Sequence, residues 1–255
     1  MSNISNGKSL SASNPFREAF RLLLLDTQPL VRSAVRASLA HLSPTVLEVN
    51  TPSAAMSALA AHRPHLVICE ISLNGPSGLD FIKGATKLLP QLRILVFSGC
   101  GEELYAPRAI RAGARAFVSK NEDPSVLSRG VEAVLGGKTF VSQSVSEIIV
   151  SQLGAKLASN SVDLLSDREL EVFTHLGEAL GTAEIARKLR VSKSTVESYR
   201  AGIKRKLGLK NAAELLRAAV ECAGLGTKCM SSPLPPPTFP STQTLPRSHI
   251  PSRLL

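Results

Sequence analysis

Long hydrophobic runs are missing from this sequence. No uninterrupted apolar stretch exceeds the length of Leu22 to Leu25, whereas a membrane-spanning helix needs ~20 such residues. The first ten residues also lack the apolar segment that follows a basic one in a secretory signal. We therefore expect neither a membrane span nor a secretory signal.

Cysteines and catalytic motifs are equally sparse. The four cysteines, at positions 69, 100, 222 and 229, form no C-x-x-C pair and no ligand cluster with the five histidines. We therefore expect no disulfide framework and no structural metal, and a reducing, cytoplasmic location is the default. A P-loop, G-x-G-x-x-G, G-x-S-x-G and H-E-x-x-H are absent, so we expect neither an enzyme nor a bound cofactor.

Basic residues, in contrast, exceed acidic ones. The chain has 30 Lys and Arg against 20 Asp and Glu, which gives a formal net charge of +10. Such an excess favours a nucleic-acid partner only where it is concentrated. Residues 187–210 hold nine basic side chains and a single acidic one, Glu197. The positive charge is therefore local.

The two ends of the chain differ in composition from its middle. Residues 1–19 are rich in Ser and Asn, and residues 225–255 contain seven prolines. We predict that both ends are disordered, because they offer little apolar surface and proline interrupts helices and strands. The segment PLPPPTFP also fits a polyproline ligand, although a solvated tail is the favoured interpretation.

Between residues 20 and 138, short apolar runs alternate with helical patterns, which is typical of β/α units and a parallel sheet. Strands are predicted at 21–26, 45–50, 65–71, 93–98 and 115–119. Helices are predicted at 29–41, 52–62, 79–89 and 102–112, and a fifth begins at Pro124 with Asp123 as its N-cap. We therefore predict a small α/β domain with five strands and helices on both faces.

From residue 139 onward only helical patterns remain. Residues 139–161 are predicted to form a helix and a linker, and residues 162–224 a separate all-α domain of four helices. These helices are placed at 167–178, 182–189, 193–207 and 211–223. Their expected caps are Ser166 with Glu169, Thr182, Ser194 with Glu197 (or Ser192 instead), and Asn211 with Glu214.

The third of these helices has two distinct faces. Val196, Tyr199, Ile203 and Leu207 form an apolar stripe, whereas the opposite face is small and polar at its start. A tight turn at 190–192 precedes it, as in a helix-turn-helix unit whose second helix enters the major groove of DNA. An ordinary amphipathic helix is the alternative, and the strong excess of basic residues disfavours it.

The motifs SDRELEV, EIARKL, STVESYR and IKRKLGLKNAAEL make residues 162–222 resemble the LuxR-type helix-turn-helix domain of NarL/FixJ-family response regulators. The resemblance implies double-stranded DNA as partner and a homodimer formed through the last helix. It implies base contacts near Glu197, Ser198 and Ala201, with Ser194 on the same face, and phosphate contacts from Lys193, Thr195, Arg200, Lys204 and Lys206. Glu197 could either accept a hydrogen bond from cytosine or repel unsuitable sequences.

Residues 20–138 resemble a flavodoxin-like receiver domain, which implies the strand order 2-1-3-4-5 and a site at the carboxyl ends of the strands. In receivers, an acidic pair and a phosphate-accepting aspartate bind Mg²⁺, and a Ser or Thr and a Lys bind the phosphoryl group. The matching positions are Asp26, Thr27, Glu70, Ser98 and Lys120. Because Thr27 lacks a charge and Glu70 is one methylene too long, we predict a degenerate pocket without ordinary aspartyl phosphorylation. The sequence leaves open whether a sensor kinase or another protein supplies the input.

Two interpretations of Glu70 remain open. In one, its carboxylate reaches Lys120 and Ser98 and holds an active-like state. In the other, the pocket has decayed and the domain serves dimerisation or partner binding, which the single charge of a glutamate favours. For the whole chain we predict a sequence-specific, DNA-binding transcription regulator. The alternative is a DNA-independent protein-interaction regulator built on a pseudo-receiver.

Overall fold

The computed structural model describes residues 20–154 and 161–225. Five parallel strands form one sheet in the order β2-β1-β3-β4-β5, as predicted. The strands are β1 (Arg21–Leu25), β2 (Thr45–Val49), β3 (Leu66–Cys69), β4 (Arg93–Ser98) and β5 (Ala116–Ser119). Leu25 lies opposite Cys69 in the register of β1 and β3. The next residues along these two strands, Asp26 and Glu70, therefore leave the sheet side by side at the point where the strand order reverses.

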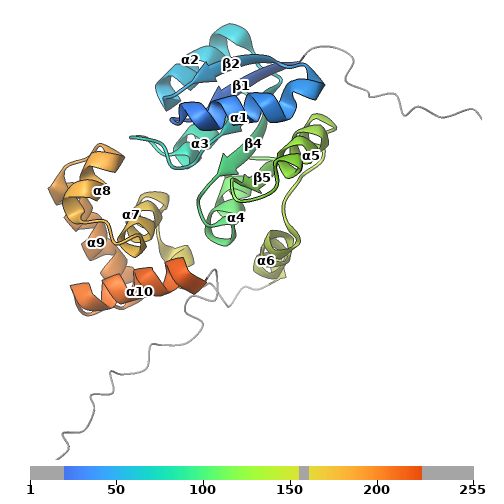
Figure 1. The fold of residues 1–255 in the computed structure, drawn as a ribbon. Coiled ribbons are helices and arrows are strands. Elements are labelled where there is room, and N and C mark those ends of the chain that lie inside the picture. Colours follow the sequence, from blue (N-terminus) through green and yellow to red (C-terminus); the bar gives the residue numbers. More distant parts are fainter. Residues whose placement is uncertain (1–19, 155–160, 226–255) are drawn as a thin grey trace, which may run out of the picture.

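Helices cover both faces of this sheet (Figure 1). They are α1 (Pro29–Leu39), α2 (Pro52–His62), α3 (Gly78–Leu88), α4 (Glu102–Ala112) and α5 (Pro124–Leu135). Successive side chains of a strand point to opposite faces, so Leu22 and Leu24 pack with α1 and α5, whereas Leu23 and Leu25 pack with α2, α3 and α4. This double coverage explains why several strands are apolar throughout.

The second part of the chain is helical. Helix α6 (Gln143–Gly154) packs on α4, and the 3-10 turn η2 (Ser161–Leu164) leads into α7 (Asp167–Gly177), α8 (Thr182–Leu189), α9 (Lys193–Leu207) and α10 (Ala212–Leu225). A Cβ atom at Gly202 would lie 2.6 Å from Glu169 Oε1, so glycine allows α9 to approach α7 closely. None of the described helices is both long and apolar enough to cross a membrane.

Several predicted boundaries differ from the structure. The first helix ends at Leu39 instead of residue 41, because the 3-10 turn η1 (Ala40–Leu42) tightens its end and Ser43 adopts a left-handed conformation at φ 51°. The cap of α8 is Gly181 instead of Thr182, and that of α9 is Ser192, the alternative considered above, instead of Ser194. Helix α10 extends to residue 225. The predictions of disorder at 1–19 and beyond 225 lie outside the described residues.

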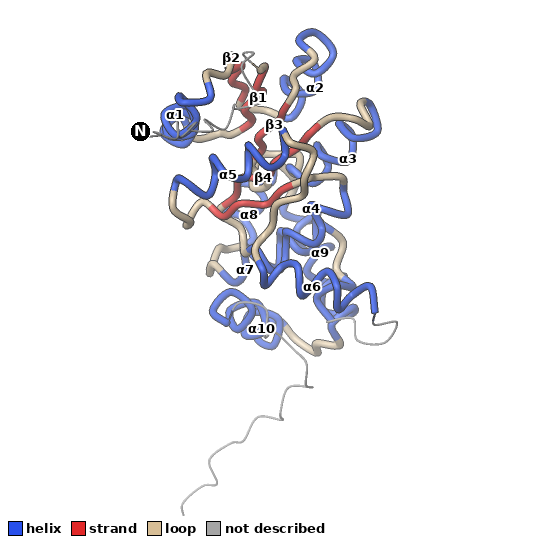
Figure 2. Tube along the Cα trace, turned by 90° about the vertical axis from the view of Figure 1, so that its right-hand side faces the viewer, coloured by secondary structure: helices blue, strands red, loops and turns tan. Residues whose placement is uncertain are grey.

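The helical domain packs against the receiver-like domain through α7, whose side chains contact α3 and α4. Figure 2 shows α7, α9 and α10 below the sheet. Asp167 of α7 accepts hydrogen bonds from Lys83 Nζ of α3 at 2.5 Å and from Arg108 Nη1 of α4 at 3.0 Å. The hydroxyl groups of Tyr105 in α4 and Thr174 in α7 lie 3.1 Å apart. These contacts bring α7 toward the edge of the sheet at which the strands end.

Candidate nucleic-acid interface and receiver pocket

Four of the five predicted pocket residues meet at the carboxyl ends of the strands. Asp26 and Glu70 directly follow β1 and β3, Ser98 ends β4, and Lys120 directly follows β5. The two acidic residues are only 2% and 5% exposed. Carboxylates buried to this extent must be compensated by a positive charge or by hydrogen bonds.

Lys120 supplies the compensating charge. Its Nζ atom lies 2.6 Å from Asp26 Oδ2 and 2.6 Å from Glu70 Oε2, so one ammonium group bridges both carboxylates. Burial of the amine disfavours its charged form, but the negative charges of Glu70 and Asp26 outweigh this effect and raise the pKa of Lys120 above its ordinary value. The lysine is therefore a permanent cation in this pocket.

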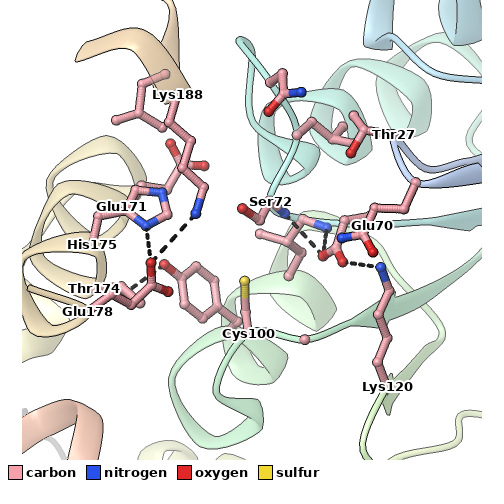
Figure 3. Close-up of a pocket in the computed structure, with 17 residues that line it drawn as sticks. Thr27, Glu70, Ser72, Cys100, Lys120, Glu171, Thr174, His175, Glu178 and Lys188 are labelled. Carbon is pink, nitrogen blue, oxygen red and sulfur yellow. Dashed lines mark hydrogen bonds and ion pairs between the residues drawn. The ribbon is translucent and has the colours of Figure 1, made fainter. Parts of the chain in front are cut away.

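The second oxygen of Glu70 is fully used as well. Glu70 Oε1 accepts hydrogen bonds from the backbone N–H groups of Ile71, at 2.6 Å, and Ser72, at 3.1 Å. It also accepts one from the hydroxyl group of Ser98. Figure 3 shows the carboxylate of Glu70 turned toward Lys120 on one side and toward Ser72 on the other. Glu70 thus reaches both Ser98 and Lys120, which the first of the two interpretations requires.

A close backbone approach holds Glu70 in this position. A Cβ atom at Gly78, the first residue of α3, would lie 2.2 Å from the carbonyl oxygen of Glu70. Only glycine leaves room for α3 to begin against the loop that follows β3. The Gly78 amide in turn donates to the carbonyl oxygen of Ile71 at 2.9 Å.

The pocket does not fit a magnesium ion. Mg²⁺ prefers near-octahedral coordination by oxygen atoms that include one or two carboxylates. Here the Lys120 ammonium group contacts both candidate carboxylates, and Asp26 Oδ1 accepts the backbone N–H of Gln28 at 2.7 Å. Thr27 lines the adjoining cavity without adding a charge. Among the described residues, no three His, Cys, Asp or Glu side chains are arranged to hold a metal.

A cavity of about 260 Å³ lies between this pocket and the helical domain. Thr27 and Lys120 line it from the receiver side, and His175 and Lys188 line it from α7 and α8. His175 Nδ1 lies 2.9 Å from Glu178 Oε2, and this hydrogen bond holds the pKa of Glu178 below its ordinary value (Figure 3). Sequence reasoning missed these residues, because no spacing or motif signals that α7 faces the receiver pocket.

Helix α9 exposes its predicted DNA-binding face. Ser192 caps the helix by accepting the Thr195 backbone N–H at 3.0 Å, and Val196 and Ile203 are completely buried on the opposite side. The exposed residues of the predicted set are Lys193, Ser194, Glu197, Ser198 and Ala201, whereas Thr195, Arg200, Lys204 and Lys206 are half-buried. The residues expected to contact bases therefore share one solvent-facing surface.

Glu197 and Arg200 of the predicted set are also bound to a residue of α8. Glu197 Oε1 accepts hydrogen bonds from Thr182 Oγ1 at 2.8 Å and from Arg200 Nη1 at 3.2 Å. Because Arg200 also donates to Thr182 at 2.6 Å, the three side chains tie α9 to the start of α8. This small network orients Glu197 before any ligand arrives.

Lys206 occupies a different environment from the other basic residues of α9. Its Nζ atom lies 2.5 Å from Glu169 Oε2, and that oxygen also accepts the Ser166 backbone N–H at 2.7 Å. Burial disfavours ionisation of Glu169, but its bonds to Lys206 and Ser166 hold its pKa below the ordinary value. Lys206 therefore stabilises the contact between α7 and α9.

Comparison with known proteins yields two matches along the chain. Residues 22–132 match the response regulator receiver domain, and residues 163–219 match the bacterial regulatory proteins of the luxR family. The chain is 33% identical over 199 residues to the Fimbriae Z protein of Escherichia coli strain K12, covering 76% of this chain and 93% of that protein. It is 34% identical over 212 residues to the transcriptional activator protein ExaE of Pseudomonas putida, covering 80% and 97%.

The chain is also similar to a solved structure. RcsB from Salmonella enterica serovar Typhimurium, bound to promoter P1flhDC in the presence of the phosphomimetic BeF3-, is 26% identical. The similarity covers 78% of this chain and 97% of that one, with a TM-score of 0.50.

Proposed function

Since this chain belongs to the luxR family of bacterial regulatory proteins and carries a response regulator receiver domain, we propose that it is a transcription regulator that binds specific DNA sequences as a homodimer. Its relatives named above include a transcriptional activator, and the RcsB structure contains a promoter. These relationships support a regulator instead of an enzyme.

The exposed face of α9 carries this proposal. Base edges in the major groove are read by small and polar side chains that can approach them closely, and Ser194, Ser198 and Ala201 offer such a surface. Lys193 stands exposed at the start of the helix, where it can neutralise a phosphate. Glu197, held by Arg200, can select against bases that present acceptors.

Helix α10 supports dimer formation. Leu216 and Val220 are 46% and 48% exposed, although both are large and apolar. They are four residues apart, so they lie on one face of the helix, and Leu215 and Ala219 are buried against the rest of the domain. A second copy that covers this apolar face would present two recognition helices to two half-sites on DNA.

The receiver pocket supports a regulator that does not depend on aspartyl phosphorylation. Glu70 stands at the phosphoacceptor position, and its carboxylate already contacts Lys120 and Ser98, the residues that would bind a phosphoryl group. We propose that this arrangement holds the receiver in one state. The contacts favour this interpretation over a decayed pocket, in which Glu70 would point elsewhere.

Selection of bound sequences from a random DNA pool, followed by gel-shift titration at several salt concentrations, tests the DNA proposal. Ser198→Ala should change the preferred sequence while leaving non-specific affinity intact, because its hydroxyl can reach base edges. Ser38→Ala on the receiver is a matched control. Two results would contradict the proposal: no sequence is enriched, or Ser198→Ala and Ser38→Ala prefer the same sequence as wild type. Helix α9 would then not read the bases, and a regulator that acts only through protein contacts would be favoured.

Incubation with radiolabelled acetyl phosphate and Mg²⁺ tests the receiver proposal. The wild-type chain should remain unlabelled, whereas the double variant Thr27→Asp/Glu70→Asp restores the acidic pair and the shorter acceptor and should be labelled. Glu70→Gln should lower transcription from a target promoter without unfolding the receiver. Stoichiometric labelling of the wild-type protein would contradict the proposal, and unchanged transcription with Glu70→Gln would favour a decayed pocket.

A further inference from the structure

A second cleft lies on the seam between the two domains and is separate from the receiver pocket. It has a volume of about 530 Å³, which is within the range of small-molecule sites. Its walls are the second half of α3, the second half of α4 and the segment that leads from η2 into α7. The lining residues are Lys83, Thr86, Lys87, Arg108, Arg111, Ala112, Asp163 and Asp167.

The cleft holds more positive than negative side chains. Four of its lining residues are cationic and two are acidic. One carboxylate, that of Asp167, forms ion pairs with two of these cations. Its oxygen atoms lie 2.5 Å from Lys83 Nζ and 3.0 Å from Arg108 Nη1. Lys87 adds an exposed ammonium group to the same wall as Lys83. An anion that enters the cleft would therefore meet a convergent positive field.

Arg108 connects this cleft to the packing of the domains. Besides Asp167, its guanidinium group donates to the carbonyl oxygens of Leu165 at 2.9 Å and Val162 at 3.1 Å. These bonds join α4 of the receiver to the segment before α7. Arginine binds phosphate groups through two parallel N–H donors, so a phosphate competes directly with Asp167 for Arg108.

An unused hydroxyl group also lies in the wall. Thr86 lines the cleft, and its buried Oγ1 atom has no hydrogen-bond partner among the described residues. A buried polar atom without a partner is destabilising, so such atoms are rare. Thr86 thus adds an unsatisfied hydroxyl group to the wall between α3 and α4.

We propose that this cleft is a binding site for a small soluble anion that carries a di- or triphosphate group. The phosphates contact Lys83, Lys87 and Arg108 and displace Asp167. The same event releases part of the contact between α4 and the segment before α7. The site thus gives the regulator a chemical input through the domain seam, and this inference does not depend on whether α9 reads DNA.

Calorimetric titration of the full chain with inorganic pyrophosphate tests this site, in Mg²⁺-free buffer at constant ionic strength. Wild type should bind one equivalent, and Lys87→Ala should weaken binding at least tenfold, because Lys87 faces the ligand without supporting the fold. Asp167→Asn should strengthen binding, since it removes the competing carboxylate. Lys138→Ala, at an exposed lysine in the loop that follows α5, is the matched control and should bind as wild type does. Circular dichroism checks that each variant is folded.

Three outcomes would overturn the proposal. If pyrophosphate does not bind saturably to the wild type, the cleft is not a binding site for it. Equal losses of pyrophosphate affinity with Lys87→Ala and Lys138→Ala would mean that pyrophosphate responds only to the net charge of the protein and occupies no specific site. If pyrophosphate does not bind and Lys87→Ala instead weakens DNA binding in a gel-shift titration, the cleft contacts DNA phosphates and its occupant is not a small anion.

Discussion

The receiver pocket and helix α9 use the same kinds of charged side chain in opposite ways. In the pocket, Lys120 is 14% exposed and bridges two buried carboxylates. On α9, Lys193 and its neighbours stand in solvent beside small polar residues. A buried charge must be satisfied within the protein, whereas an exposed charge remains available to a ligand. Burial therefore separates charges that maintain a conformation from charges that bind a partner.

This difference bears on regulation. A pocket in which Glu70, Asp26 and Lys120 satisfy one another has no free carboxylate for a metal and no free ammonium for a phosphoryl group. Several residues of α9, in contrast, stand in solvent. The information that modulates DNA binding would then have to enter elsewhere, and the seam between the domains is the place where the two regions are connected.

Lys120→Met should have the largest effect on stability. It leaves the carboxylates of Asp26 and Glu70 close together, buried and without a cation, which costs about 3 kcal/mol. Urea unfolding followed by circular dichroism measures the loss, and the exposed Lys138→Met should change stability by less than about 0.5 kcal/mol. A loss of stability as small as that of the control would mean that the pocket carboxylates are hydrated. The pocket and α9 would then not differ in how their charges are satisfied.

Lys206→Met should have an intermediate effect on stability. It compares a paired lysine of α9 with the exposed Lys193 of the same helix. The sequence predicts a phosphate contact for Lys206, but its ammonium group is paired with the buried Glu169. We expect a loss of stability of about 1 to 2 kcal/mol from the stranded carboxylate, and only a small change in the salt dependence of DNA binding. If the slope of log affinity against log salt instead fell by a full unit and stability did not change, Lys206 would contact a DNA phosphate after all.

The strands themselves could be predicted from the sequence because they follow from local rules, whereas the strand order and the choice of pocket members came from the resemblance to receiver domains. Asp26, Glu70 and Lys120 directly follow apolar runs, and parallel strands end at one edge of a sheet. The apolar stripe of α9 likewise follows from helical periodicity. In these cases a short pattern is enough to place a side chain at the end of a strand or on one face of a helix.

The contacts between the domains could not be predicted in this way. Arg108 and Asp167 are 59 residues apart in the sequence, and each is an ordinary polar residue on the surface of its own domain. The choice between them and other surface charges depends on how two folded domains fit together. The engagement of Lys206 with Glu169 lies within the helical domain and was missed for a related reason: a basic residue at the end of a helix looks the same in sequence whether or not a carboxylate of another helix faces it.

Asp167→Asn tests a carboxylate of intermediate burial. Burial of Asp167 opposes ionisation, but bonds from Lys83 and Arg108 outweigh it and hold the pKa of this carboxyl below its ordinary 3.8. A lowered folded-state pKa stabilises the protein at pH values above the unfolded pKa, and this advantage is lost as the pH falls through the folded value. Wild type should therefore exceed Asp167→Asn in stability at pH 6, and the difference should shrink below pH ~4. Urea unfolding across this range measures it, and a constant difference would contradict the ion pairs.

Lys193→Ala should have the smallest effect on stability and yet a clear effect on binding. Lys193 is exposed at the first position of α9 and takes part in no ion pair among the described residues, so unfolding free energy should change by less than about 0.5 kcal/mol. If it neutralises one DNA phosphate, the slope of log affinity against log salt should fall by about one unit for specific and non-specific DNA alike. The slope for Lys138→Ala should equal that of wild type. Equal slopes for Lys193→Ala and wild type would show that exposure alone does not make a charge available to DNA.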